Sequence, residues 1–181
     1  MSAVRAPLVA YVGLGANQGN APKTFALALD ALDRLPGVRL GRVSGTYRTE
    51  PQGLREQPFF LNQAAALYCE RTVSAHFLLQ RMLDLEKIYG RVRRTGERKD
   101  GPRPLDLDLL LFGQEELNSP GLILPHPRMR RRAFALIPLA EISPELIFPD
   151  GESIATALGK IRYRLTGECI FQEDEAAPNT L

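Results

Sequence analysis

The sequence of 181 residues lacks tryptophan and contains only two cysteines and two histidines. Cys69 and Cys169 lie far apart and fit no zinc-ligand spacing, so we expect a reducing, cytoplasmic setting without a zinc site. No apolar stretch approaches the roughly 20 residues that span a bilayer, and we expect no membrane association. With 44% hydrophobic residues, the chain is long enough to bury the core of one domain.

Two common nucleotide-binding motifs are also missing. The segment GLGANQGN has glycines at positions 13, 15 and 19, which leaves Gln18 where the G-x-G-x-x-G motif requires its third glycine. The chain has no G-x-x-x-x-G-K-[ST] segment either, so a bound ATP would not be held by a P-loop. The preceding apolar residues superficially resemble a signal peptide, but the glycines and polar residues favour a buried strand and a tight turn.

Positive charge is concentrated in two short segments although the net charge is only +2. The basic residues of these segments are Arg91, Arg93, Arg94, Arg98, Lys99, Arg103, Arg128, Arg130, Arg131 and Arg132. Compact clusters fit the phosphates of a nucleotide, whereas a nucleic-acid binder more often shows a broad basic stripe. A solvated basic surface is the alternative for either cluster taken alone.

Helix and strand patterns are mixed along the first 140 residues. We expect strands at 8–14, 38–48, 60–70, 105–112 and 122–124, and helices at about 21–35, 74–89 and 129–140. Several connections are short enough for hairpins, which favours an α+β fold with a largely antiparallel sheet flanked by helices over a doubly wound parallel sheet. We expect one domain at 1–160 and a partly disordered tail at 161–181.

The segment GPRPLDLDLLLF at 101–112 places two aspartates in an apolar run. Strand alternation would put Leu105, Leu107, Leu109 and Leu111 on one face and Asp106, Asp108, Leu110 and Phe112 on the other. The two carboxylates would then point the same way, about 7 Å apart at the backbone. Their oxygens suit Mg²⁺, and two ions about 4 Å apart could share such a pair. Exposed charges that protect a sheet edge are the alternative.

Four further side chains are candidates for ligand contacts. His126 lies between two prolines and, with Arg132, could donate to a phosphate oxygen, although a loop histidine without a role is the alternative. Phe60 and Phe134 are core residues by default. Asn62 shares a strand face with Phe60, and its carboxamide can match the polar edge of a flat heterocycle.

Three segments together resemble the 6-hydroxymethyl-7,8-dihydropterin pyrophosphokinases. They are YRTEPQGLREQPFFLN at 47–62, GPRPLDLDLLLFG at 101–113 and LPHPRMRRRAFALIPLAEISPEL at 124–146. The resemblance implies a ferredoxin-like α+β fold and the transfer of pyrophosphate from ATP to the hydroxymethyl group of the pterin, with AMP as second product, in folate biosynthesis. It also implies two Mg²⁺ ions. We expect a monomer that binds these small molecules and no nucleic acid.

The resemblance also assigns roles to particular residues. The catalytic positions are Arg91, Arg93, Arg103, Asp106 and Asp108, of which Asp106 and Asp108 match the magnesium-binding aspartates. The ATP-binding positions are Glu86, Arg98, His126 and Arg132. The pterin-binding positions are Thr49, Gln57, Phe60, Asn62 and Phe134. A tryptophan often precedes the family's G-P-R segment, and here Lys99 or Asp100 stands in its place.

Two other classes of protein use parts of this pattern. A polymerase-β-like nucleotidyltransferase also uses a D-x-D pair, but its G-S motif lies shortly before the aspartates, whereas the glycine turn here lies at 13–19. A basic nucleic-acid-binding module would explain the arginines. It would not require the aspartates, which repel phosphate unless a metal ion intervenes.

Overall fold

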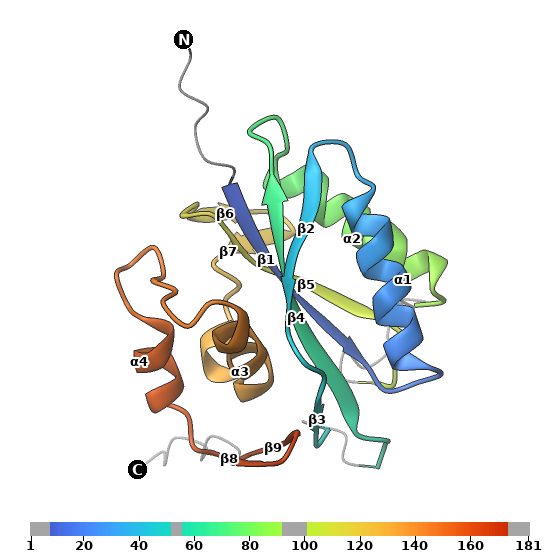
Figure 1. Cartoon of the computed structure of the whole chain (residues 1–181), viewed down its shortest axis with the longest axis vertical. Coiled ribbons are helices and arrows are strands. Elements are labelled where there is room, and N and C mark those ends of the chain that lie inside the picture. The colour runs from blue at the N-terminus through green and yellow to red at the C-terminus, as the bar shows by residue number, and fades with distance from the viewer. Residues whose placement is uncertain (1–7, 52–55, 92–100, 174–181) are drawn as a thin grey trace.

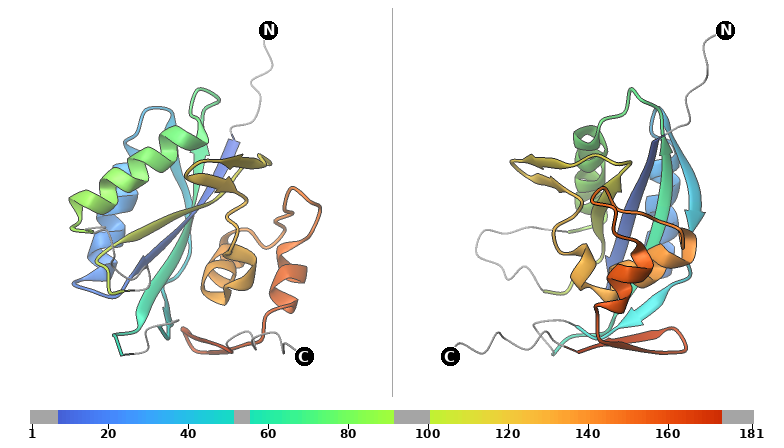
Figure 2. Two further views of the ribbon diagram at one scale, coloured as in Figure 1. Left: turned by 180° about the vertical axis from the view of Figure 1, so that it is seen from behind. Right: turned by 90° about the vertical axis from the view of Figure 1, so that its left-hand side faces the viewer.

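A central β-sheet separates two pairs of helices in the computed structural model, which describes residues 8–51, 56–91 and 101–173 (Figure 1). Helices α1 (Ala21–Asp33) and α2 (Ala75–Ile88) cover one face of the sheet. Helices α3 (Ala133–Ile142) and α4 (Ile154–Gly159) cover the other, as both views of Figure 2 show. Each face of the sheet therefore has its own hydrophobic cluster.

Seven strands form the main sheet within the described residues. They are β1 (Leu8–Ala16), β2 (Val38–Val43), β3 (Tyr47–Thr49), β4 (Phe60–Cys69), β5 (Asp106–Phe112), β8 (Tyr163–Thr166) and β9 (Cys169–Gln172). Their order is β5-β1-β4-β3-β9-β8, and β2 also pairs with β4. Strands β6 (Leu117–Ser119) and β7 (Leu122–Leu124) form a separate hairpin. Because every pair except β3–β9 is antiparallel, the predicted α+β class and largely antiparallel sheet are confirmed.

The first two helices begin where the sequence predicts. Asn20 Oδ1 accepts a hydrogen bond from the Lys23 amide at 3.2 Å, and Pro22 lies in the first turn, where a missing N–H costs nothing. Ser74 caps α2, since its Oγ accepts from the Phe77 amide at 3.1 Å, and Gly90 follows the end of α2 with φ of 89°. Local capping thus defines both helices that back the sheet.

Three segments differ from the sequence prediction. The strand expected at 38–48 is two strands, because Ser44 breaks the ladder: its hydroxyl accepts from the Ala64 amide at 2.9 Å. The helix expected at 129–140 is a 3₁₀ turn (Met129–Arg131) followed by α3, with Arg132 extended between them. Residues 163–172, expected in a tail, form the β8–β9 hairpin, and residues 174–181 lie outside the described part of the chain.

A bulge in β5 overturns part of the predicted alternation. Val12 pairs with Leu109 and Tyr11 pairs with Leu111, so that Leu110 has no partner in the β1–β5 register. The alternation of faces consequently shifts after Leu110, so that Leu110 and Leu111 lie on the same side of the sheet. Leu111 packs in the cluster beside α3, and Phe112 packs in the cluster beside α1 and α2. The faces predicted for Leu111 and Phe112 are therefore wrong, while those of Asp106 and Asp108 hold.

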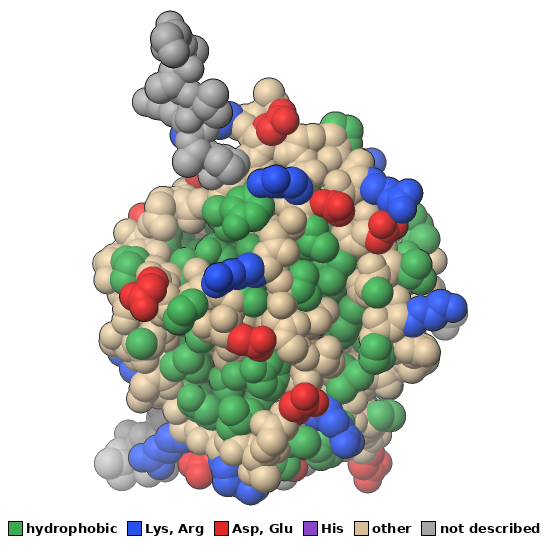
Figure 3. All heavy atoms as spheres, in the orientation of Figure 1, with side chains coloured by type: hydrophobic (Ala, Val, Ile, Leu, Met, Phe, Trp, Pro, Cys, Tyr) green, Lys and Arg blue, Asp and Glu red, His purple; other side chains and the backbone are tan. Residues whose placement is uncertain are grey.

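Two further observations concern the surface charges and the helices. The face shown in Figure 3 carries Lys and Arg side chains singly, with acidic and hydrophobic side chains between them. In the three described segments, no helix has the length and apolar character needed to cross a membrane.

Candidate active site

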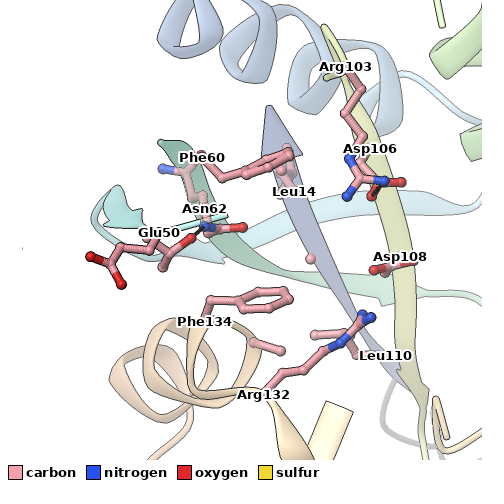
Figure 4. Close-up of a pocket in the computed structure, with 15 residues that line it drawn as sticks. Leu14, Glu50, Phe60, Asn62, Arg103, Asp106, Asp108, Leu110, Arg132 and Phe134 are labelled. Carbon is pink, nitrogen blue, oxygen red and sulfur yellow. Dashed lines mark hydrogen bonds and ion pairs between the residues drawn. The ribbon is translucent and has the colours of Figure 1, made fainter. Parts of the chain in front are cut away.

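A pocket lies on the sheet face beside the start of α3, and eight of the residues predicted for the site line it (Figure 4). They are Thr49, Phe60, Asn62, Arg103, Asp106, Asp108, Arg132 and Phe134. Strands β3, β4 and β5 and the segment just before β5 supply one group of these residues, and the turn before α3 and the start of α3 supply another. Segments far apart in the sequence thus meet at one site.

The floor of the pocket is formed by two glycines of β1. Gly13 and Gly15 line the pocket, and Gly15 pairs with Asn62 on one side and Asp106 on the other. A Cβ atom at Gly15 would lie 3.4 Å from Asn62 Oδ1, inside the space between these side chains. Both glycines keep the floor open, whereas the sequence prediction placed them in a tight turn. Only Gly19, with φ of 66°, has the backbone of such a turn.

One end of the pocket is aromatic. In Figure 4, the rings of Phe60 and Phe134 lie on opposite sides of the space, with Asn62 between them. Asn62 is buried, and its Nδ2 donates to Thr49 Oγ1 at 2.7 Å, which fixes the orientation of the carboxamide. Two facing rings with an oriented amide at their edge can bind a flat polar heterocycle.

A guanidinium group lies over each ring. Arg103 Cζ is 5.1 Å from the centroid of the Phe60 ring, and Arg132 Cζ is 5.3 Å from that of Phe134. Such cation–π contacts orient both arginines along the pocket walls. Positive charge therefore borders the aromatic end on both sides.

The other end is charged, and its two carboxylates differ. Arg91 Nη1 forms an ion pair with Asp106 Oδ1, and Arg103 Nη1 lies 3.1 Å from Asp106 Oδ2. Burial alone would raise the pKa of Asp106, but the charges of Arg103 and Arg91 outweigh it and hold that pKa below its usual value. Asp106 is thus an ionised group whose charge the protein already balances.

The negative charge of Asp108 is balanced less well by neighbouring positive groups than that of Asp106. Burial, and then the negative charge of Asp106, raise the pKa of Asp108 above its usual value. His126 Nε2 is 3.9 Å from its Oδ1, and 38% of the Asp108 side chain is exposed, toward the pocket that it lines. This carboxylate is open to a cation.

His126 is held in one orientation by backbone contacts. Its amide donates to the Leu110 carbonyl at 2.9 Å, and its Nδ1 accepts from the Arg128 amide at 3.3 Å. Burial lowers the pKa of His126, with Arg132 and Arg128 acting in the same direction and Asp108 opposing them. The neutral ring therefore carries its proton on Nε2, the atom that faces Asp108.

Glu86 lies beneath the strand and is only 1% exposed. Its Oε1 accepts from Arg91 Nη1 at 2.6 Å and from the Leu107 amide, between the two aspartates, at 2.8 Å. These contacts hold both the Arg91 guanidinium and the β5 backbone between the two aspartates. Glu86 is not among the residues that line the pocket, so its role as a nucleotide contact stays a prediction.

The remaining predicted residues lie at the rim or outside the described segments. Gln57 Oε1 accepts from Asn17 Nδ2 at 3.0 Å, and Asn17 Oδ1 accepts from the Arg103 amide at 2.8 Å. Asn17 therefore joins the end of β1 to two site segments, a role that the sequence analysis did not identify. Arg93 and Arg98 lie outside the described residues.

Known proteins resemble this chain over most of its length. The family model for 7,8-dihydro-6-hydroxymethylpterin-pyrophosphokinase (HPPK) matches residues 11–144. Relatives named 2-amino-4-hydroxy-6-hydroxymethyldihydropteridine pyrophosphokinase, from Methylorubrum extorquens and Pseudomonas aeruginosa, are each 43% identical to this chain. The matches cover 84% and 93% of this chain and 92% and 96% of the relatives.

The fold has a counterpart among solved structures. A crystal structure of a Plasmodium falciparum HPPK-DHPS protein with pteroate superposes with a TM-score of 0.54 at 13% identity. The match covers 93% of this chain and 49% of that one, and it shows the ferredoxin-like type of fold. The family model and the two 43% identical relatives confirm the resemblance found in the three sequence segments. The chain belongs to the 7,8-dihydro-6-hydroxymethylpterin-pyrophosphokinase family.

Proposed function

We propose that the pocket in Figure 4 binds the pterin at its aromatic end and the phosphates of ATP at its charged end. As a member of its family, the chain transfers pyrophosphate from ATP to the hydroxymethyl group of 6-hydroxymethyl-7,8-dihydropterin, a step of folate biosynthesis. The observation that supports the residue assignment is that two facing rings and two aspartates line one pocket.

At the aromatic end, the Phe60 and Phe134 rings would enclose the pterin and exclude water from its faces. Asn62, held by Thr49, would offer its carboxamide to the polar edge of the ring. In this arrangement the hydroxymethyl group would face the aspartates across the glycine floor. Binding at this end therefore sets the direction of attack.

The charged end fits magnesium by the chemistry of its donors. Among the described residues, no group of three or more His, Cys, Asp and Glu side chains is placed to hold a metal ion. Mg²⁺ nevertheless needs only one or two protein carboxylates, because water and phosphates fill its other positions. We propose that Asp106 and Asp108 hold two Mg²⁺ ions, which would neutralise phosphate charge when bound. The raised pKa of Asp108 is consistent with this role, because a cation would relieve its uncompensated charge.

The protein's own side chains then position the phosphates. Arg103 and Arg132 border the pocket and would neutralise phosphate oxygens, while the Nε2 proton of His126 offers a neutral hydrogen bond. The hydroxymethyl oxygen attacks the β-phosphorus in line, the bond from that phosphorus to the α-phosphate oxygen breaks, and AMP leaves as the hydroxyl proton is released. Positioning and charge neutralisation supply the acceleration in such transfers.

The test is AMP release from MgATP by the purified protein with and without 6-hydroxymethyl-7,8-dihydropterin. Pterin-dependent AMP formation, with one pterin diphosphate per AMP, is the expected result. ADP formation would contradict pyrophosphoryl transfer, and AMP formation independent of pterin would contradict the acceptor. We also propose that a monomer is sufficient, because this chain alone supplies the two rings, the oriented amide and both aspartates, and sedimentation of the active protein checks this.

We also propose that the arginines serve the nucleotide and not a nucleic acid. Arg103 and Arg132 border the pocket together with carboxylates, which would repel a polyanion that carries no metal ion. Salt-sensitive RNA binding in the presence of EDTA would contradict this proposal, since counterion release governs such binding.

A further inference from the structure

The C-terminal hairpin, β8–β9, contacts both walls of the aromatic end although it lies outside residues 11–144 of the family match. Strand β9 pairs in parallel with β3, where Ile170 lies opposite Thr49. Ile170 is 2% exposed and forms a hydrophobic cluster with Ala133, against which Phe134 packs. The hairpin therefore links the wall that holds Asn62 to the wall that holds Phe134.

Gln172, in the last position of β9, makes two hydrogen bonds that flank a pocket residue. Its Oε1 accepts from the Ala133 amide at 2.7 Å, and its Nε2 donates to the Arg131 carbonyl at 2.7 Å. Both backbone groups adjoin Arg132. One carboxamide thus holds the chain on either side of this arginine.

The start of α3 needs such a partner. Its N-cap position is Arg132, whose side chain makes no capping hydrogen bond. A short polar side chain normally caps a helix by accepting from the first-turn amides. Here the Arg132 side chain lines the pocket and its guanidinium lies over Phe134, so the capping acceptor comes from another strand. Gln172 satisfies the first amide of the helix and leaves the Arg132 side chain available to a ligand.

We infer that Gln172 is a positioning residue for the pyrophosphoryl transfer, an inference that rests on the proposed function. It fixes the turn that presents Arg132 to the phosphates and Phe134 to the pterin. Displacement of a positioning group by about 1 Å can cost two orders of magnitude in rate, so loss of both hydrogen bonds has a measurable effect. The C-terminal hairpin is accordingly part of the active site's supporting structure.

The test compares Gln172→Met with Gln114→Met. Methionine keeps the length and the apolar stem of glutamine and removes both hydrogen bonds. Gln114 provides the matched control, because its Nε2 donates to the Ile147 carbonyl at 3.2 Å and it is not among the residues that line the pocket. The readouts are kcat for AMP formation, the Kd of the pterin by calorimetry, the melting temperature, and amide hydrogen exchange at residues 131–136.

For Gln172→Met we expect kcat to fall about tenfold and the pterin Kd to rise severalfold, with faster exchange confined to the start of α3. Its melting temperature should fall somewhat more than that of Gln114→Met, because two hydrogen bonds are lost instead of one, but the protein should stay folded. Unchanged kcat and Kd would overturn the inference, as would global unfolding of Gln172→Met, which would make Gln172 a residue of fold stability. If the wild-type protein itself makes no AMP with pterin, the proposed function fails instead.

Discussion

The two ends of the pocket are built in different ways. At the aromatic end, Phe60 and Asn62 come from the middle strand β4 and are 8% and 6% exposed, and the neutral hydroxyl of Thr49 fixes the Asn62 carboxamide. At the charged end, Asp106, Arg91 and Arg103 balance one another, while Asp108 stays open to the pocket. The aromatic end is a preformed shape, and the charged end is a set of charges that a ligand must complete.

Within the charged end, the two aspartates also differ in how well their charges are balanced. They lie on one face of β5, yet arginines hold the pKa of Asp106 low, whereas burial and Asp106 itself raise the pKa of Asp108. The protein has stabilised the charge of one carboxylate and not that of the other. We therefore expect substitutions at the two ends to separate into effects on rate and effects on pterin affinity.

The largest effect is expected for Asp108→Ala at the charged end. Removal of a proposed magnesium ligand should lower kcat by about a thousandfold or more, while the circular dichroism spectrum stays unchanged. The control is Asp84→Ala, which removes a carboxylate from the exposed side of α2. A kcat for Asp108→Ala within threefold of the control would refute the metal role.

A smaller and more selective effect is expected for Asn62→Ala at the aromatic end. The variant should raise the pterin Kd by about 10- to 100-fold, because it removes the oriented amide, and leave the MgATP Kd within about twofold. Calorimetry with each ligand in turn measures both constants. An equal loss of affinity for MgATP would show that the two ends are not separate.

Glu86→Gln tests whether a buried carboxylate supports the charged end or contacts the nucleotide. We expect the free energy of unfolding to fall by about 2 kcal/mol, because Arg91 loses a charged hydrogen-bond partner. Urea denaturation measures this loss, with the exposed Glu145→Gln as control. If stability equals that of the control and the MgATP Kd rises instead, Glu86 acts as a direct nucleotide contact.

The smallest effect concerns stability and pH. Because the folded-state pKa of Asp108 is raised, the folded protein binds this proton more tightly than the unfolded chain does. Its contribution to stability is therefore lost as the pH rises through the folded-state pKa. In EDTA, Asp108→Asn should melt slightly above wild type at pH 7, and this difference should vanish below the ordinary aspartate pKa of 3.8.

A thermal scan of both proteins from acidic to neutral pH checks this expectation. Asp84→Asn is the control for loss of a surface charge. A lower melting temperature for Asp108→Asn at pH 7 would mean that the Asp108 carboxylate stabilises the ligand-free fold, which would contradict the expectation that its charge is poorly balanced there.

Much of the fold could be predicted from local patterns in the sequence. Caps at Asn20 and Ser74 and the apolar spacing of both helices define α1 and α2, and alternation places both aspartates on one face. The bulge at Leu110 could not be predicted, because it depends on the register against β1. The β8–β9 hairpin was missed because its pairing with β3 spans more than 100 residues of chain.

The site residues also fall into two groups, those that the sequence could predict and those that it could not. Asp106, Asp108, Phe60 and Asn62 could be predicted from residue type, because carboxylates suit a cation and an aromatic ring beside an amide suits a flat heterocycle. The roles of Gly15, Asn17 and Gln172 depend on contacts between distant segments, which residue type alone does not indicate. Two glycines two positions apart in an apolar strand were the available sign of an open pocket floor, since both lie on one strand face.

A crystal structure with Mn²⁺, the pterin and α,β-methylene-ATP tests the proposed binding of metal ions and pterin most directly. A methylene group replaces the bridging oxygen of the bond that the reaction breaks, so the ternary complex should persist. We predict anomalous density for manganese at the oxygens of Asp106 and Asp108, with the pterin between Phe60 and Phe134. Manganese that contacts neither aspartate, or a pterin bound outside the two rings, would contradict this proposed binding mode.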